Sequence, residues 1–395
     1  MICATDVATA RVQGIDPSAA NLCASLVHSA DAIGRGPGFA ASYAPGESET
    51  HVPPALATTA FVYDNALAAI ALTGCGQVSR AAKIGDAILV AIHHDRTFRD
   101  GRIRNAYKAG AIAGTPALPG WWDASTKTWA EDAYQDSTAT GNVAWAALAL
   151  LTLRQATGHH AYSDGAKVLL DWIDTHTSTT SGYSGGFYGF DNNQKPLLWK
   201  STEHNIDVAA AANWLSELTH DPRCREMSSR ARGFVAGAFD GTHFRIGALA
   251  DGRPNDAPIV LDVQLWPSMA LPDAPAQWRR GLSFAEERLS VDGGFSFSGA
   301  RDGVWTEGTA QAALAYRVAG DQVRAAEILQ HLQSARAPSG LLYATRAPRL
   351  ATGLAIGPDS TKPDFFYFPR PHLGATAWAA LAALGWDPFT GKEVN

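Results

Sequence analysis

The residues best placed to do chemistry stand at the starts of Ala-rich apolar segments, and the densest group lies in TEHNIDVAAAANWL. There Glu203 is followed by His204 and Asn205 and, one helical turn after it, by Asp207. Two carboxyl groups that enter from one helix end raise each other's pKa, so one of them can hold a proton near neutral pH and donate it. Helix capping does not need so many polar groups. We therefore predict that Glu203 and Asp207 are catalytic candidates and that His204 and Asn205 bind substrate.

Other acids occupy comparable places in the chain. Asp64 in VYDNALAAIAL, Asp262 in LDVQLWPSMAL and Glu307 in WTEGTAQAALAY each begin an apolar segment, and Asp132 in EDAYQDSTATGN precedes another. An acid in the first turn also stabilises a helix through the helix dipole. Each of these positions therefore has a structural explanation beside the catalytic one.

Aromatic residues are concentrated in the long connections before these segments, where they alternate with acids. Carbohydrate sites combine rings that stack on the apolar faces of sugars with carboxylates and amides that bind the hydroxyl groups. A loop aromatic can equally anchor its loop to the core. We expect Trp121, Trp122, Tyr134, Trp199 and Trp305 to bind substrate, with at least two of the four tryptophans lining one cleft.

The apolar segments recur six times and are predicted to be inner helices, because a helix that is apolar nearly all round suits burial on two sides. They begin near Asp64, Asn142, Glu203, Asp262, Glu307 and Thr376. The segments between them have one apolar stripe and one charged face, as expected of outer helices. These outer segments are 77–92, 162–173, 222–239, 274–289 and 321–335.

The N-terminal segment 17–34 is amphipathic and has no inner partner, so we expect it to be the sixth outer helix and to close a ring. The sequence thus predicts a single all-α domain over residues 1–395. It would be a toroid of six inner and six outer helices, with long loops and short strands at the face that carries the acids. We expect Thr202 and Thr306 to be the N-caps of their helices.

Composition and motifs exclude several classes of function. The formal charge of −6 over 395 residues leaves no basic stripe for a nucleic acid. No apolar run reaches the roughly 18 to 20 residues that cross a bilayer. Neither a metal-ligand spacing such as HExxH nor a phosphate-binding glycine motif is present, so we expect no cofactor and no metal. We also expect a monomer.

The four cysteines, Cys3, Cys23, Cys75 and Cys224, are widely and irregularly spaced, and we expect them to be core thiols. The N-terminal residues lack a basic region followed by an apolar one, so no export signal is visible. Localisation stays open: secreted or periplasmic if a signal has been trimmed, and otherwise cytoplasmic.

The six-hairpin pattern, with acids and aromatics at one face, resembles the (α/α)6-barrel carbohydrate-active enzymes from about residue 17 to residue 389. The resemblance implies a glycoside hydrolase that acts on an oligo- or polysaccharide with two carboxyl groups, one protonating the glycosidic oxygen and the other activating water. Most hydrolases of this architecture invert the anomeric centre. We predict Glu203 as the general acid and Asp64 or Glu307 as the base, with Asp132 and Asp262 as further candidates.

Other functions fit the same architecture. A polysaccharide lyase would act on uronic-acid polymers and would draw on His204, Asn205, Tyr107, Arg104 or Tyr134. The segment beginning VDGGF also resembles one in terpene-cyclase and prenyltransferase toroids, but their DxDD, DDxxD and zinc ligands are absent. A non-catalytic toroid that binds a glycan or a peptide is the alternative from another class, and it would not need acids that converge on one point.

Overall fold

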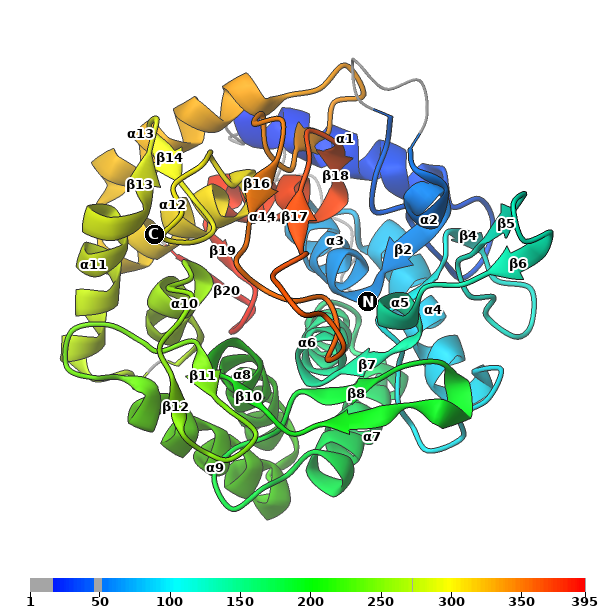
Figure 1. Ribbon diagram of the computed structural model, residues 1–395. Coiled ribbons are helices and arrows are strands. Elements are labelled where there is room, and N and C mark those ends of the chain that lie inside the picture. The colour runs from blue at the N-terminus through cyan, green and yellow to red at the C-terminus, as the bar shows by residue number, and fades with distance from the viewer. Residues whose placement is uncertain (1–16, 46–51, 272, 395) are drawn as a thin grey trace, which may run out of the picture.

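Helices dominate the computed structural model, which describes residues 17–45, 52–271 and 273–394. Six of them lie around the centre (Figure 1): α3 (Val62–Gly74), α6 (Thr140–Thr157), α8 (Thr202–Thr219), α10 (Asp262–Ala270), α12 (Thr306–Ala319) and α14 (Leu373–Leu384). Each contacts the next one in this order, and α14 contacts α3. The arrangement is compatible with the expected all-α toroid.

A second set of helices lies outside the first. It consists of α1 (Pro17–Asp31), α4 (Val78–His94), α7 (His160–His176), α9 (Pro222–Ala238), α11 (Arg280–Leu289) and α13 (Gln322–Leu332). Short helices α2 (Pro54–Ala57) and α5 (Ala133–Asp136) and the 3₁₀ turns η2 (Asp191–Asn193), η3 (Ala276–Arg279) and η4 (Gln333–Ala335) lie between the long elements. Among the described residues, no helix is both long and apolar enough to span a bilayer.

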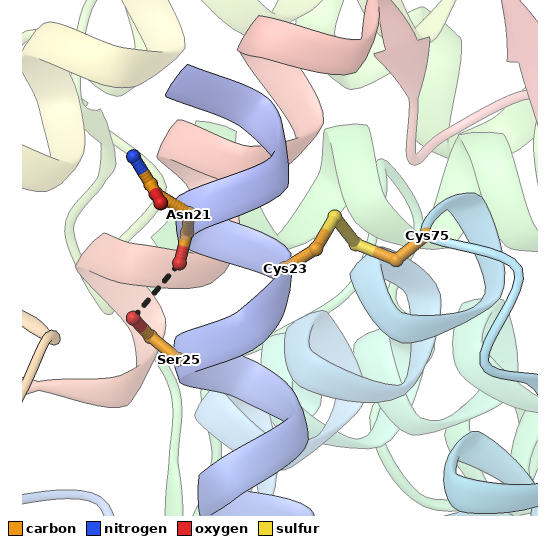
Figure 2. Close-up of a disulfide and its surroundings, with 4 residues drawn as sticks. All are labelled: Asn21, Cys23, Ser25 and Cys75. Carbon is orange, nitrogen blue, oxygen red and sulfur yellow. Dashed lines mark hydrogen bonds between the residues drawn. A yellow bond between two sulfur atoms is a disulfide. The ribbon is translucent and has the colours of Figure 1, made fainter. Parts of the chain in front are cut away.

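Helix α1 packs against α14 and α3, and a disulfide joins its Cys23 to Cys75 at the end of α3 (Figure 2). The expectation of core thiols was therefore wrong for this pair, because irregular spacing in sequence says nothing about two helices that pack side by side. Cys224 is a buried free thiol, as expected. Cys3 lies outside the described residues.

The loops contain short antiparallel strands, as predicted. The two-stranded pairs are β1 (Gly38–Phe39) with β4 (Gly110–Ala111), β2 (Thr59–Phe61) with β3 (Ala106–Lys108), β5 (Trp121–Asp123) with β6 (Thr128–Ala130), β13 (Ser290–Val291) with β14 (Gly294–Phe295), β15 (Leu342–Tyr343) with β18 (Pro371–His372), β16 (Leu350–Ala351) with β17 (Phe366–Tyr367), and β19 (Trp386–Asp387) with β20 (Lys392–Glu393). The three-stranded sheets are β7 (Thr138–Ala139), β8 (Gly186–Tyr188) and β9 (Lys195–Leu197), and β10 (Lys200–Ser201), β11 (Gly247–Ala248) and β12 (Pro254–Asn255).

A polar side chain near the start of an inner helix binds the backbone of a loop, and this contact recurs around the ring. The Oδ1 atom of Asn205 accepts a hydrogen bond from the amide of Tyr183 at 2.8 Å, and its Nδ2 atom donates to the carbonyl of Tyr183 at 3.0 Å. Asn65 binds Ala40 in the same way. Comparable contacts are made by Gln264 with Phe244, Thr309 with Phe295, and Thr376 with Leu342. These bonds hold the helix starts in fixed positions.

The middle of the ring is filled by aromatic side chains. Trp145, Trp266 and Trp378 come from α6, α10 and α14, and their ring centroids lie 5.6 to 5.8 Å apart. Phe389, between β19 and β20, packs against all three at 5.1, 5.4 and 6.2 Å. This aromatic floor makes the ring a packed core rather than a pore.

Candidate active site

Five carboxyl groups stand near the starts of four inner helices: Asp64, Glu203, Asp262 and Glu307 in the first turns, and Asp207 one turn after Glu203. Burial, followed by the negative charges of Asp262 and Glu307, raises the pKa of Glu203 well above its ordinary value. Burial raises the pKa of Asp262 to about 6. The charge of each of these acids affects the pKa of others in the group, so the five lie close together. They are here called the acid cluster.

Glu203 differs from the other four in being partly exposed, whereas they are buried. Its carboxyl group forms no hydrogen bond or ion pair with any residue that the structure describes. The N-cap of its helix is Ser201, whose hydroxyl accepts from the amide of His204, while Thr202 donates to the carbonyl of Arg245. The prediction of Thr202 as the cap was wrong, and so was that of Thr306, since α12 begins after Trp305 without a side-chain cap. Glu203 is thus free to meet a ligand.

His372 connects two of the acids. Its Nε2 atom lies 3.2 Å from Oδ2 of Asp64, and its Nδ1 atom lies 3.6 Å from Oε2 of Glu307. Burial opposes protonation of the imidazole, but the charges of Asp64 and Glu307 outweigh it and raise the pKa of His372. His372 was not among the predicted site residues, because it reaches Asp64 and Glu307 only through tertiary packing. Its place directly before the last inner helix was the available signal.

Gly374 lets these groups approach closely. A Cβ atom at this position would lie 2.6 Å from Oδ1 of Asp64 and 3.2 Å from Oε2 of Glu307. The two carboxyl oxygens are therefore within about 6 Å of each other.

Glu307 is held by a chain of hydrogen bonds that ends in the aromatic floor. The indole of Trp378 donates to the hydroxyl of Tyr63 at 2.9 Å, and that hydroxyl donates to Oε1 of Glu307 at 2.7 Å. Burial, opposed by the charge of His372 and reinforced by that of Asp64, raises the pKa of Glu307 to about 7. Tyr63 was also missed, although it directly precedes Asp64 in sequence.

Asp207 lies beneath Glu203. It has no exposed surface, and neither of its carboxyl oxygens has a hydrogen-bond partner among the described residues. Burial, and then the charges of Glu203 and Asp262, raise its pKa well above the ordinary value, while the nearby Trp145 acts in the opposite direction. A protonated Asp207 fits these surroundings.

Several aromatic side chains surround the acid cluster. Trp199 is 38% exposed, packs on Gly185, and lies 5.6 Å from the ring of His204. Burial lowers the pKa of His204 to about 4, so its imidazole is neutral at ordinary pH. Burial, and then the charges of Glu203, Asp64 and Asp132, raise the pKa of Tyr134. Trp199, Tyr134 and His204 thus lie near the acid cluster, and their role in ligand binding stays a prediction.

Other predicted residues have structural roles. The side-chain amide of Asn205 forms two hydrogen bonds with the backbone of Tyr183. Asp132 caps α5 by accepting a hydrogen bond from the amide of Gln135 at 3.0 Å. Trp305 is 3% exposed, between Phe297 and Tyr367. These contacts give each side chain a structural role, and its part in binding or catalysis stays a prediction.

Trp121 and Trp122 lie on the β5–β6 hairpin, which projects at the edge of the molecule (Figure 1). Trp122 faces Trp129 across the two strands and is 62% exposed. Figure 1 places this hairpin away from the inner helix starts, so a role in substrate binding stays a prediction for both tryptophans. A cavity of about 360 Å³, lined by Asp302, Thr306 and His331 among others, also lies outside the acid cluster.

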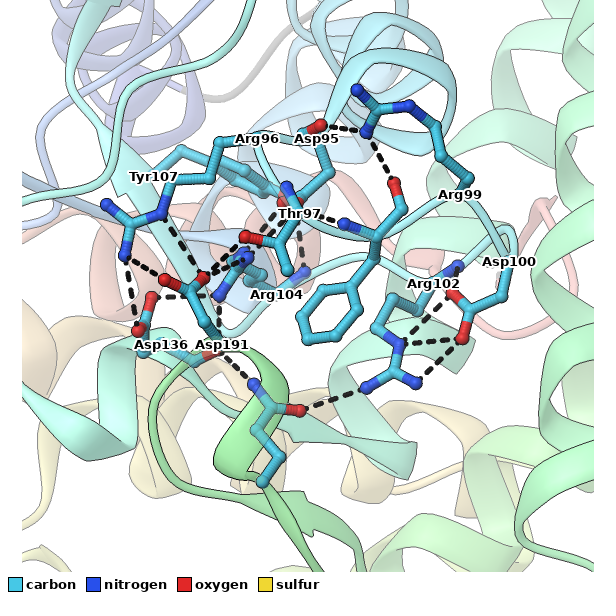
Figure 3. A network of polar contacts seen from close by, with 12 residues as sticks. Asp95, Arg96, Thr97, Arg99, Asp100, Arg102, Arg104, Tyr107, Asp136 and Asp191 are labelled. Atoms are coloured by element: carbon cyan, nitrogen blue, oxygen red, sulfur yellow. Dashed lines mark hydrogen bonds and ion pairs between the residues drawn. The ribbon is translucent and has the colours of Figure 1, made fainter.

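A charged network braces the loops on the α4 side of the site (Figure 3). Arg104 has no exposed surface and pairs with Asp95 at 2.7 Å, Asp136 at 3.0 Å and Asp191 at 2.8 Å. Tyr107 donates to Asp95 at 3.3 Å. The network ties the end of α4 to α5 and η2. No group of His, Cys, Asp and Glu in the described ranges is arranged to hold a metal ion.

Comparison with known proteins shows the fold. No protein-family model matches the chain, and neither does any curated protein sequence. Among solved structures, it is similar to a glycosidase in complex with glucose, with a TM-score of 0.61 at 15% identity over 94% of this chain and 99% of that one. It is also similar to an alpha-amylase from Clostridium perfringens, with a TM-score of 0.62 at 9% identity over 92% of this chain and 96% of that one.

Two further structures extend this similarity. A GH76 alpha-mannanase from Bacteroides thetaiotaomicron matches with a TM-score of 0.58 at 13% identity over 95% of this chain and 97% of that one. A sugar epimerase from a ruminal bacterium matches with a TM-score of 0.62 at 13% identity over 93% and 99%. The fold is therefore like that of glycosidases and related sugar-acting proteins, in agreement with the resemblance seen in the sequence.

Proposed function

We propose that this protein is a glycoside hydrolase acting on an oligo- or polysaccharide, built as one (α/α)6 domain that helix α1 closes. The observation that carries the proposal is Glu203: a partly exposed carboxyl group without a protein partner, whose pKa is raised by burial and by Asp262 and Glu307. A general acid needs such a group, because it must hold a proton near neutral pH and face the substrate.

In the proposed reaction, Glu203 donates its proton to the glycosidic oxygen as the bond from that oxygen to the anomeric carbon breaks. A water oxygen bonds to the anomeric carbon from the opposite face and gives its proton to the second carboxylate. We assign that base to Glu307, which Tyr63 and His372 orient. Asp64 acts through His372 as a positioning residue. Positive charge that develops on the sugar ring is stabilised by the carboxylate of Asp262, whereas Asp207 stays protonated.

The spacing of Asp64 and Glu307 argues against using those two acids as the pair. Inverting hydrolysis requires roughly 6.5 to 9.5 Å between the two carboxyl groups, so that water fits between base and sugar. Asp64 and Glu307 approach within about 6 Å across Gly374, which is too close for this purpose. We therefore pair Glu307 with Glu203, which stands on a third helix, α8, and has no protein partner among the described residues.

The alternatives are less well supported. A lyase needs a cation or amide free to neutralise a uronate carboxylate, but Arg104 is buried among three aspartates and Asn205 is engaged by backbone. A cluster of acids would also repel a uronic-acid polymer. A purely binding toroid gives no reason to crowd five carboxyl groups together at a cost in desolvation.

The disulfide bears on localisation. Disulfides persist in oxidising compartments, so the Cys23–Cys75 bond favours secretion or the periplasm over the cytoplasm. We propose that the protein acts there as a monomer.

A substrate screen tests the proposal. The purified protein would be incubated with a panel of soluble neutral polysaccharides and with uronic-acid polymers, and reducing ends and unsaturated uronates would be measured. We expect new reducing ends from a neutral glycan, and none from the same glycan with Glu203→Gln. Unsaturated uronate products would instead establish a lyase, and full activity of Glu203→Gln would remove Glu203 from the mechanism.

A further inference from the structure

The connection between β16 and β17, residues 352–365, forms a preformed projection, here called the finger. The amides of Asp364 and Phe365 both donate to the carbonyl of Leu354 at 3.1 Å, which closes its base. Farther out, the Asp364 carboxylate accepts from the amide of Ile356 and from the hydroxyl of Ser360, both at 2.8 Å. Because the finger is bonded to itself, it holds its shape without a ligand.

The finger extends across the site from β16 and β17 on one side to β8 on the other. At its base, the ring of Tyr367 lies 6.4 Å from that of His372, which contacts Asp64 and Glu307 of the acid cluster. At its tip, a Cβ atom on Gly357 would lie only 2.4 Å from the hydroxyl of Tyr188 in β8. Figure 1 shows this orange segment running from β16 and β17 across the ring centre toward β7 and β8.

The finger also contacts a third part of the ring. A Cβ atom on Gly353 would lie 3.1 Å from Pro258, in the loop before α10. Connections that precede α8, α10 and α14 are thus bridged by one segment over the starts of the inner helices.

We infer that the finger restricts the enzyme to the ends of glycan chains; this inference rests on the proposed hydrolase function and specifies its substrate. Cleavage inside a polymer needs a path for the chain on both sides of the scissile bond. The finger, which contacts Pro258 and Tyr188, blocks one of these paths. The substrate class is therefore the terminal sugar or sugars of a neutral oligosaccharide, and Gly357 and Tyr188 are specificity-determining residues.

The test compares three variants on whichever polysaccharide of the panel the wild type hydrolyses. In the first, residues 355–363 are replaced by two glycines, which leaves the bonded pair Leu354 and Asp364 in place. In the second, Gly357→Val drives the tip away from Tyr188. The third adds Tyr188→Ala to Gly357→Val and restores the space. Gly299→Val is the matched control, because a Cβ atom there meets nothing within 4 Å.

The readout is the ratio of viscosity loss to reducing ends formed, together with the product sizes. We expect the wild type and Gly299→Val to release one product size from chain ends. The shortened finger and Gly357→Val should raise the ratio by about ten-fold or more, and the double variant should lower it again. A wild type that already yields mixed internal fragments, or variants that leave the ratio unchanged, would overturn the inference while the hydrolase proposal stands. A wild type that hydrolyses no glycan would defeat both.

Discussion

The hydroxyl of Tyr63 donates a hydrogen bond of 2.7 Å to Oε1 of Glu307. This bond stabilises the ionised carboxylate and so lowers its pKa, against the larger effect of burial, which brings the value to about 7. If Glu307 is the base, activity rises with pH as this group loses its proton.

Tyr63→Phe should therefore move the acidic limb of the pH–rate profile to higher pH and lower kcat by about ten-fold, since a bond to a charged group is lost. Tyr162→Phe is the control, because Tyr162 on the outer helix α7 donates to the carboxylate of Asp86 on the outer helix α4, and neither belongs to the acid cluster. An unshifted limb would show that Glu307 is not the titrating base.

Glu203→Gln should lower kcat by about 10²-fold or more while the thermal unfolding temperature stays close to that of the wild type. Gln keeps the shape of the side chain but has no proton to transfer. Glu217→Gln, at the far end of the same helix, controls for helix effects, because the Glu217 carboxylate accepts a hydrogen bond only from the Asn213 amide among the described residues. Near-normal activity of the Glu203 variant would make Asp262 the acid to test next.

The features that the sequence predicted correctly were those that follow from a local pattern, whereas those that depend on tertiary contacts were missed. The inner helices were visible because burial on two sides makes them apolar all round, and the acids at their starts could be read directly. The partners of these acids could not be read in this way. His372 and Tyr63 join the acids only through contacts between α14, α12 and α3, which no local pattern encodes. The placement of Trp122 on a peripheral hairpin, and the Cys23–Cys75 bond, likewise depend on tertiary packing.

Stability should fall as pH rises from about 4 to about 8. The folded protein keeps protons on Asp207, Asp262 and Glu307 at pH values where the unfolded chain has released them, because the pKa of each is raised on folding. The folded state therefore binds more protons in this window, and the linkage relation makes its stability decrease with pH.

Asp207→Asn removes one of these protons from the balance. We expect its unfolding temperature to exceed that of the wild type at pH 8 and to depend less on pH, as measured by calorimetry at several pH values. Asp171→Asn, which removes an exposed acid paired with Lys167, should leave the pH dependence unchanged. A steeper dependence in the Asp207 variant would mean that this acid is ionised when folded.

The disulfide should contribute about 2 to 4 kcal/mol to the free energy of unfolding, since it closes a loop between residues 52 positions apart in sequence. Cys23→Ser with Cys75→Ser should lower the midpoint of urea unfolding without changing kcat, because the bond lies away from the acid cluster. A reducing agent should reproduce the loss in the wild type but not in the variant. Equal stability of the two proteins would show that α1 is held by packing alone.

Gly374→Ala tests whether the spacing of the acids matters for catalysis. The added methyl group would lie 2.6 Å from Oδ1 of Asp64 and 3.2 Å from Oε2 of Glu307, so these carboxyl groups must move. A shift of this size in a catalytic base can lower kcat by about 10²-fold. Gly237→Ala is the matched control: it also lies in a helix, its Cβ atom meets nothing within 4 Å, and the substitution should stabilise α9 slightly. Gly374→Ala should therefore lose activity while remaining folded, as circular dichroism and kinetics on the same samples would show. If it kept its activity, Glu307 could not be the base whose position the proposed reaction requires.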